Sequence, residues 1–156
     1  MMKPTNSGAT VKSASSPSLA APSSVFLVDD DASVRRALAR LIKSAGHSVQ
    51  TFASAREFLD TQAGGDGAAC LVLDVRMPGV TGIDLQRELQ TLNRDVPIVF
   101  ITGHGDIPMS VKAMKAGAVD FLPKPVKDTD LLRAIEQALA RALRDRAARK
   151  ELADVE

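Results

Sequence analysis

Tryptophan and tyrosine are absent from this sequence, and 5 phenylalanines supply all of its aromatic rings of the Phe, Tyr and Trp class. Intrinsic fluorescence is therefore a poor probe of this protein. Cysteine occurs once, as Cys70, which excludes an internal disulfide and favours a reducing compartment. Its neighbours are small or apolar, so we expect a buried core thiol rather than a nucleophile. No apolar run reaches about 18 residues, so no membrane span is expected.

Neither positive nor negative charge predominates, because the formal net charge is only +1 at pH 7. That balance argues against a basic field over the whole molecule for binding nucleic acid. Lys3 and Lys12 are not followed by an apolar core, so a secretory signal is not expected and the cytoplasm is the default location. Residues 1–24 have almost no large apolar side chains and are predicted to be a disordered leader.

What the sequence does have is a repeated rhythm of short apolar runs, each followed by apolar residues at helical spacing. Five segments are predicted to be strands: Val25–Val28, His47–Phe52, Cys70–Leu73, Val96–Ile101 and Val119–Leu122. A helix is expected after each of them. The last helix begins near Asp128 and keeps its apolar period through Leu143.

Five β–α repeats of this kind predict an α/β fold. Most of the strands read as continuous apolar runs rather than alternating ones, which is typical of strands buried on both faces of a parallel sheet with helices on each side. Right-handed crossovers then favour a doubly wound, flavodoxin-like sheet of five strands. We expect the order 2-1-3-4-5, because the short and more polar second strand suits an edge.

Polar residues end the apolar strands. Asp29 and Asp30 follow the first strand, Asp74 the third, Thr102 the fourth and Lys124 the fifth. In an open α/β sheet, ligands bind at the carboxyl ends of the strands, near the point where the strand order reverses. We therefore expect these five side chains to meet at one edge of the sheet.

Three carboxylates gathered at one edge would repel one another. A like-charge pair about 4 Å apart costs roughly 4 kcal/mol at an effective dielectric constant near 20. A cation must offset this cost, and hard oxygen ligands favour Mg²⁺ or Mn²⁺. One carboxylate could then act as a nucleophile toward phosphorus, with the ammonium and hydroxyl stabilising the transferred oxygens.

Taken singly, each of these residues has a simpler interpretation. An aspartate at a strand end is more often a turn or cap residue, and Asp31 is expected to cap the first helix. Thr102 could bond to a loop backbone, Lys124 could be a solvated charge, and His104 is expected to be an exposed loop residue. The joint occurrence of the polar set at four strand ends is what favours function.

Four segments together resemble the receiver domains of two-component response regulators (CheY-like proteins). The matching segments are Val28-Asp29-Asp30-Asp31, Leu73–Gly79 with Gly82, Ile101-Thr102-Gly103 and Phe121–Pro125. The stretches 101–109 and 113–121 resemble in particular the FixJ-type subclass of LuxR-family transcriptional regulators. The resemblance covers about residues 25–143.

The resemblance implies a role for each matching position. Asp74 would accept a phosphoryl group from a sensor histidine kinase, and Thr102 and Lys124 would contact that group. Asp29 and Asp30 would hold Mg²⁺ together with Asp74 and the backbone carbonyl of Arg76.

Further implied roles lie around this site. Phe121 would be an aromatic switch, here without the hydroxyl of the commoner tyrosine, and the Lys124–Pro125 bond would be cis. Arg76 and His104 would tune the lifetime of the phosphate. Phosphorylation would remodel the face formed by the fourth helix, fifth strand and fifth helix, and would favour a homodimer. Met109 could belong to that face or to the core.

Two other classes of protein share parts of this pattern. A phosphatase or phosphotransferase of the haloacid-dehalogenase class also has a strand-end aspartate nucleophile, but it needs a second aspartate two residues later, where this sequence has Arg76. A nucleotide-binding module needs a glycine-rich loop after the first strand, where this sequence has Asp30-Asp31-Ala32-Ser33. Neither class is favoured.

The resembling subclass normally carries a DNA-binding helix-turn-helix domain after the receiver. Residues 144–156 are expected to be a C-terminal helix extension, a linker to an output domain that is absent from this chain. Its basic residues are diluted by acidic ones, so DNA contact is expected only through that output domain. The alternative is a complete single-domain response regulator that acts through protein–protein contacts.

Overall fold

The computed structural model describes residues 23–61, 68–77, 79–103 and 107–155, with side chains described as far as residue 149. The predicted leader, residues 1–24, lies almost wholly outside these ranges, and so does His104. The first strand begins at Ser24, one residue before its predicted start, because Ser24 already pairs with Ser48 and Ala69.

Five strands form one sheet, and every pair of neighbours in it is parallel. The strands are β2 (Ser24–Val28), β3 (Ser48–Phe52), β4 (Ala69–Asp74), β5 (Ile98–Thr102) and β6 (Asp120–Pro123). Their order across the sheet is β3-β2-β4-β5-β6, which confirms the predicted order 2-1-3-4-5. The edge strand β3 is largely solvent-exposed, as its mixed sequence predicted.

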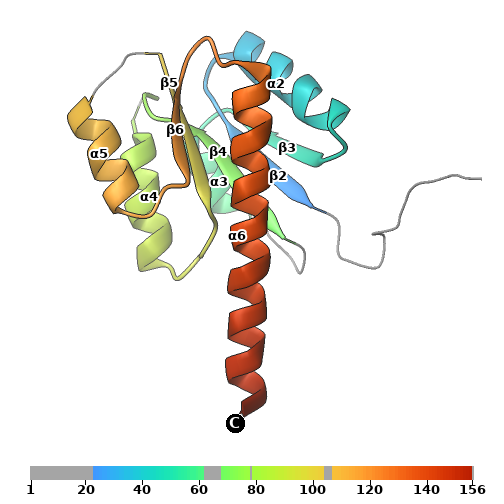
Figure 1. Ribbon diagram of the computed structural model, residues 1–156. Helices are drawn as coiled ribbons and strands as arrows, with labels where there is room; N and C mark the ends of the chain where they lie inside the picture. Colours follow the sequence, from blue (N-terminus) through green and yellow to red (C-terminus); the bar gives the residue numbers. More distant parts are fainter. Residues whose placement is uncertain (1–22, 62–67, 78, 104–106, 156) are drawn as a thin grey trace, which may run out of the picture.

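The helices are α2 (Ala32–Ser44), α3 (Ala55–Asp60), α4 (Gly82–Thr91), α5 (Ile107–Lys115) and α6 (Asp128–Val155). Helices α2 and α6 cover one face of the sheet, and α3, α4 and α5 cover the other (Figure 1). The central strands β2, β4 and β5 are buried on both faces, so successive side chains enter two separate cores. All five phenylalanines of the sequence pack on the α3–α5 face.

Side-chain caps begin the helices that lead away from the sheet. Asp31 caps α2, as predicted, by accepting bonds from two amides of the first turn. Ser54 caps α3 by accepting from the amide of Glu57, and the Glu57 side chain accepts from the amide of Ala53, so only half of a capping box is formed. Thr81 forms a complete capping box at α4, which the sequence analysis did not identify.

Helix α6 is 28 residues long and continues past the end of the sheet (Figure 1). Its buried residues lie between Leu131 and Ala142 and pack on the sheet. Residues 144–155, which we call the α6 extension, continue the same helix. No helix among the described residues is long and apolar enough to cross a membrane.

Candidate functional site

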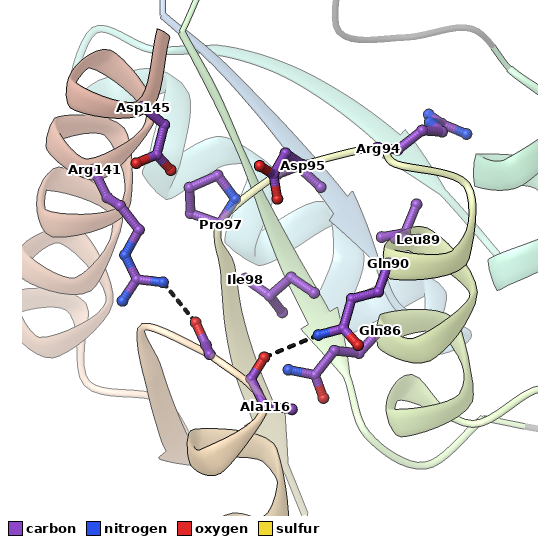
Figure 2. A pocket seen from close by; sticks show the side chains of 12 residues that line it. Gln86, Leu89, Gln90, Arg94, Asp95, Pro97, Ile98, Ala116, Arg141 and Asp145 are labelled. Carbon is purple, nitrogen blue, oxygen red and sulfur yellow. Dashed lines mark hydrogen bonds between the residues drawn. The ribbon is translucent and has the colours of Figure 1, made fainter. Parts of the chain in front are cut away.

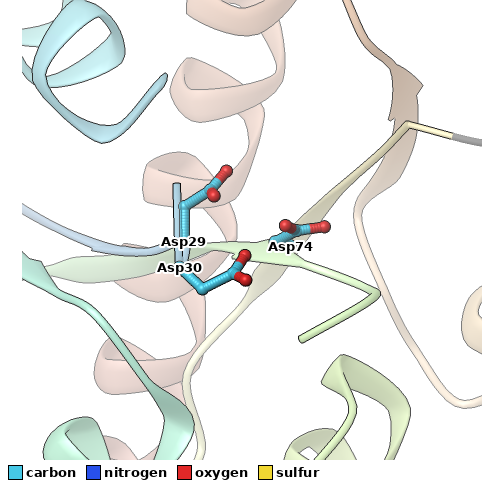
Figure 3. A group of neighbouring side chains, drawn as sticks. All are labelled: Asp29, Asp30 and Asp74. Carbon is cyan, nitrogen blue, oxygen red and sulfur yellow. The ribbon is translucent and has the colours of Figure 1, made fainter. Parts of the chain in front are cut away.

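The carboxyl ends of the central strands bring three carboxylates together. Asp29 and Asp30 follow β2, and Asp74 is the last residue of the adjacent strand β4. One carboxylate oxygen from each of the three lies within 4.8 Å of the others. Figure 3 shows them gathered at one end of the sheet. The structure thus confirms the predicted convergence.

Burial distinguishes the members of this cluster. Asp29 is 0% exposed and Asp74 is 4% exposed, whereas Asp30 is exposed to solvent. Thr102 ends β5 beside them and is 3% exposed. A small polar site with one open carboxylate can therefore be reached from solvent on the side of Asp30.

Lys124 follows the edge strand β6 and pairs with both buried carboxylates. Its ammonium Nζ lies 3.0 Å from Asp29 Oδ2 and 3.2 Å from Asp74 Oδ2. The backbone amide of Lys124 donates to the carbonyl of Thr102 at 2.7 Å, which fixes the start of the loop. The Lys124–Pro125 bond is cis, as the resemblance implied.

Crowding shifts the ionisation of this site. Burial, and then the charge of Asp29, raises the pKa of Asp74 above its ordinary value, although Lys124 and the Arg76 amide oppose the shift. Burial alone would lower the pKa of Lys124. Its bond to Asp29 and the charges of Asp29 and Asp74 outweigh that effect, and the pKa of Lys124 is raised. The ammonium is therefore held in its charged form between two acids.

The donor atoms suit a hard divalent cation. Asp29 Oδ1 accepts from the amide of Asp31 at 2.8 Å, and Asp74 Oδ1 accepts from the amide of Arg76 at 3.2 Å. Asp29 Oδ2 is buried and accepts no well-aligned hydrogen bond from the described residues, although Lys124 Nζ is 3.0 Å away. A cluster of carboxylate oxygens with such an atom fits Mg²⁺ or Mn²⁺.

The other predicted site residues lie around this cluster. Arg76 is exposed, two residues after Asp74, and His104 lies outside the described residues. Phe121 is half-buried in β6, with its ring centroid 5.9 Å from that of Phe100. Met109 is partly buried against the core of the α3–α5 face, so it packs as a core residue.

Gly82, at the start of α4, has two contacts with the strand end that the sequence did not predict. A Cβ added to Gly82 would lie 2.7 Å from the carbonyl oxygen of Asp74, so only glycine lets α4 approach the strand end this closely. The amide of Gly82 donates to the carbonyl of Val75 at 2.8 Å. The available signal was the pair Thr81-Gly82, a capping residue followed by the smallest residue at a predicted helix start.

Comparisons with known proteins identify this arrangement. Residues 25–136 match the family model described as the response regulator receiver domain. The chain belongs to the response regulator receiver domain family. Among solved structures, the receiver resembles response regulator StyR, with a TM-score of 0.80 and 51% identity over 86% of this chain and 67% of that one. The N-terminal FixJ structure gives a TM-score of 0.71 and 43% identity over 77% of this chain and 95% of that one.

The curated relatives include a nodulation protein and a transcriptional regulatory protein. Nodulation protein W of Bradyrhizobium diazoefficiens is 53% identical over 131 residues, which are 84% of this chain and 57% of that protein. Transcriptional regulatory protein FixJ of the same organism is 46% identical over 118 residues, 76% of this chain and 57% of that protein. These relatives make the receiver one of the FixJ type. The chain spans little more than half the length of each.

Proposed function

We propose that Asp74 accepts a phosphoryl group from the phosphohistidine of a sensor histidine kinase, and that the receiver works as a phosphorylation switch. The observation that carries this proposal is the position of Asp74, a buried carboxylate beside two others and 3.2 Å from the Lys124 ammonium. An oxygen of Asp74 attacks phosphorus. As the new O–P bond forms, the P–N bond breaks and its electron pair stays on the imidazole of the kinase.

Each neighbour contributes to this transfer. Asp29, Asp30, Asp74 and the backbone carbonyl of Arg76 would hold Mg²⁺ or Mn²⁺. The bound ion would neutralise the crowded carboxylates and the phosphoryl oxygens. Lys124 already stands beside Asp74 and would pair with one phosphoryl oxygen, while the Thr102 hydroxyl would turn toward another. Arg76 and His104 would control the approach of the hydrolytic water and so the lifetime of the phosphate.

The readout would be a population shift on the face built from α5, β6 and α6. Thr102 lies at the end of β5 opposite Pro123 of β6, and Phe121 packs against Phe100 two residues earlier along the paired strands. Movement of Thr102 toward phosphate would open space for the Phe121 ring. Three exposed apolar side chains, at i, i+4 and i+7, lie on one side of α5 by helical spacing: Ile107, Val111 and Met114. They support a homodimer that forms on phosphorylation, with DNA bound only through an output domain outside this chain.

Acetyl phosphate with Mg²⁺ provides the direct test of the phosphoacceptor. Intact-protein mass spectrometry should show one added phosphoryl group, absent from Asp74→Asn. Asp31→Asn is the matched control, since Asp31 is an aspartate of the same region that caps α2, and it should label normally. Full labelling of Asp74→Asn would contradict the assignment of the site.

Metal binding and dimerisation are tested separately. Asp30→Ala should weaken Mg²⁺ binding measured by titration calorimetry, and an unchanged titration would contradict its role as a ligand. Beryllofluoride with Mg²⁺ should convert monomer to dimer in sedimentation velocity. Val111→Glu, which places a charge in the exposed stripe of α5, should prevent that conversion without preventing phosphorylation.

A further inference from the structure

The last turn of α5, which ends at Lys115, and the two residues after it accept hydrogen bonds from side chains of two other helices. Gln86 of α4 donates to the carbonyl of Ala113 at 3.2 Å, and Gln90 donates to the carbonyl of Ala116 at 3.0 Å. The guanidinium of Arg141 in α6 donates to the carbonyl of Gly117 at 2.5 Å. Figure 2 shows the bonds from Gln90 and Arg141 converging from opposite sides. Carbonyls at the end of a helix lack partners within the helix. The Ala113 carbonyl also accepts from the amide of Ala118 at 3.1 Å, and the side chains of α4 and α6 add donors from outside α5.

Apolar packing holds α5 only weakly. Ala113 is its one buried residue, and Met109 is partly buried, whereas Ile107 at the first position is 77% exposed. An element with few buried apolar contacts lies at the low-stability end of a structure. The polar bonds at the C-terminal end of α5, of which the Gln86 bond is buried and the other two are exposed, therefore add to what fixes this helix to the domain.

Arg141 links the C-terminal end of α5 to α6. Its bond carries a full positive charge to a carbonyl at the negative end of α5, which is a favourable geometry. A cavity of about 180 Å³ lies beside the three donors, between α4, the end of α5 and α6. The nearby ion pair of Arg149 with Asp95, at 3.6 Å, is exposed and adds less.

We propose that the C-terminal end of α5 is a hinge, and that Arg141 is the positioning residue that transmits the tilt of α5 to the α6 extension. A displacement that begins at the phosphoacceptor end of β5 would move the weakly packed first turn of α5 and rotate the helix about its tethered last turn. Displacement of the Gly117 carbonyl would then move Arg141 of α6, which lies just before the α6 extension begins. The direction of signalling rests on the proposed function, but the tether itself does not.

Hydrogen–deuterium exchange of the unmodified protein tests the tether. Arg141→Ala should speed amide exchange in the last turn of α5 and in residues 144–155 at least threefold relative to the wild type. Arg141→Lys keeps a charged donor and should restore much of the protection. Arg144→Ala removes an exposed arginine from the same helix and should change nothing. Equal exchange in Arg141→Ala and Arg144→Ala would overturn the tether.

The same measurement with beryllofluoride and Mg²⁺ tests transmission. In the wild type, the mimic should change exchange both in α5 and in residues 144–155. In Arg141→Ala the change in α5 should remain, and the change in residues 144–155 should vanish. A response of the extension that is equal in both proteins would refute transmission through Arg141. If the mimic leaves α5 unchanged in the wild type, the proposed switch fails, and with it the transmission, while the comparison in unmodified protein still decides the tether.

Discussion

Replacing Lys124 by methionine removes the charge that separates two buried carboxylates while keeping the apolar stem. The ammonium lies 3.0 Å from Asp29 Oδ2 and 3.2 Å from Asp74 Oδ2, and the lysine side chain is 21% exposed. Removing one partner of a buried ion pair costs about 3–5 kcal/mol, because a charge is left without compensation. Since the lysine is partly exposed, we expect the lower end, about 3 kcal/mol of unfolding free energy at pH 7 without metal.

Urea unfolding followed by far-ultraviolet circular dichroism measures this loss, because the chain has no tryptophan or tyrosine for fluorescence. With an m-value of about 2 kcal/mol/M, the midpoint should fall by about 1.5 M. Lys127→Met is the matched control, since Lys127 is an exposed lysine three residues later, and its midpoint should stay near that of the wild type. Equal midpoints for the two variants would refute the reasoning.

The pH dependence gives a second check on the same variant. The pKa of Asp74 is already raised by burial and by Asp29, and Lys124 opposes that rise. Without Lys124 the pKa of Asp74 rises further. The cost of Lys124→Met is therefore present above this pKa and is lost as the pH falls through it, when the carboxyl takes up a proton. A cost that stays constant down to pH 4 would show that it has another origin.

Three further predictions concern the folded core and a cap. Burial raises the pKa of Cys70 to about 12, whereas an unfolded thiol titrates near about 8.5. At pH values above the pKa of the unfolded thiol, the unfolding free energy of the wild type should therefore fall relative to that of Cys70→Ala. The expected difference is about 2.5 kcal/mol at roughly pH 10.5, measured by urea titrations at each pH. Equal pH profiles of unfolding free energy in the wild type and Cys70→Ala would refute the thiol as the cause of this loss. Gly82→Ala should destabilise by about 2 kcal/mol, since its Cβ would meet the Asp74 carbonyl at 2.7 Å; a gain in the urea midpoint, as expected for alanine in an open helix, would refute the close approach. Asp31→Ala should cost about 1 kcal/mol by thermal unfolding through loss of the α2 cap, and no change would contradict the cap.

The fold and the central cluster could be predicted because both follow from local patterns. The apolar runs that end at Val28, Leu73 and Ile101 read as strands buried on both sides, and the parallel order aligns their carboxyl ends. Once that order is set, Asp29 and Asp74 must be neighbours. Pattern and topology therefore predicted that the polar residues at the strand ends lie together.

Contacts between distant helices could not be predicted in this way. Gln86, Gln90 and Arg141 read as ordinary polar residues of amphipathic helices, because their carbonyl partners are backbone atoms that carry no sequence signal. The sequence likewise could not place Lys124 equally near two carboxylates, since that depends on how the loop after β6 turns. The apolar residues of α5 show the same limit, because Met109 packs inward while its neighbours Ile107 and Val111 face solvent.

The uneven distribution of phenylalanine between the two faces of the sheet has a practical consequence. All five rings lie on the α3–α5 face, and the face covered by α2 and α6 is packed by aliphatic side chains and Cys70. Ring-current shifts of methyl resonances and near-ultraviolet circular dichroism therefore report on one half of the molecule. That half contains Phe121 and the weakly packed α5. The phenylalanine signals therefore report on the side that is expected to move, and the opposite side contributes little to them.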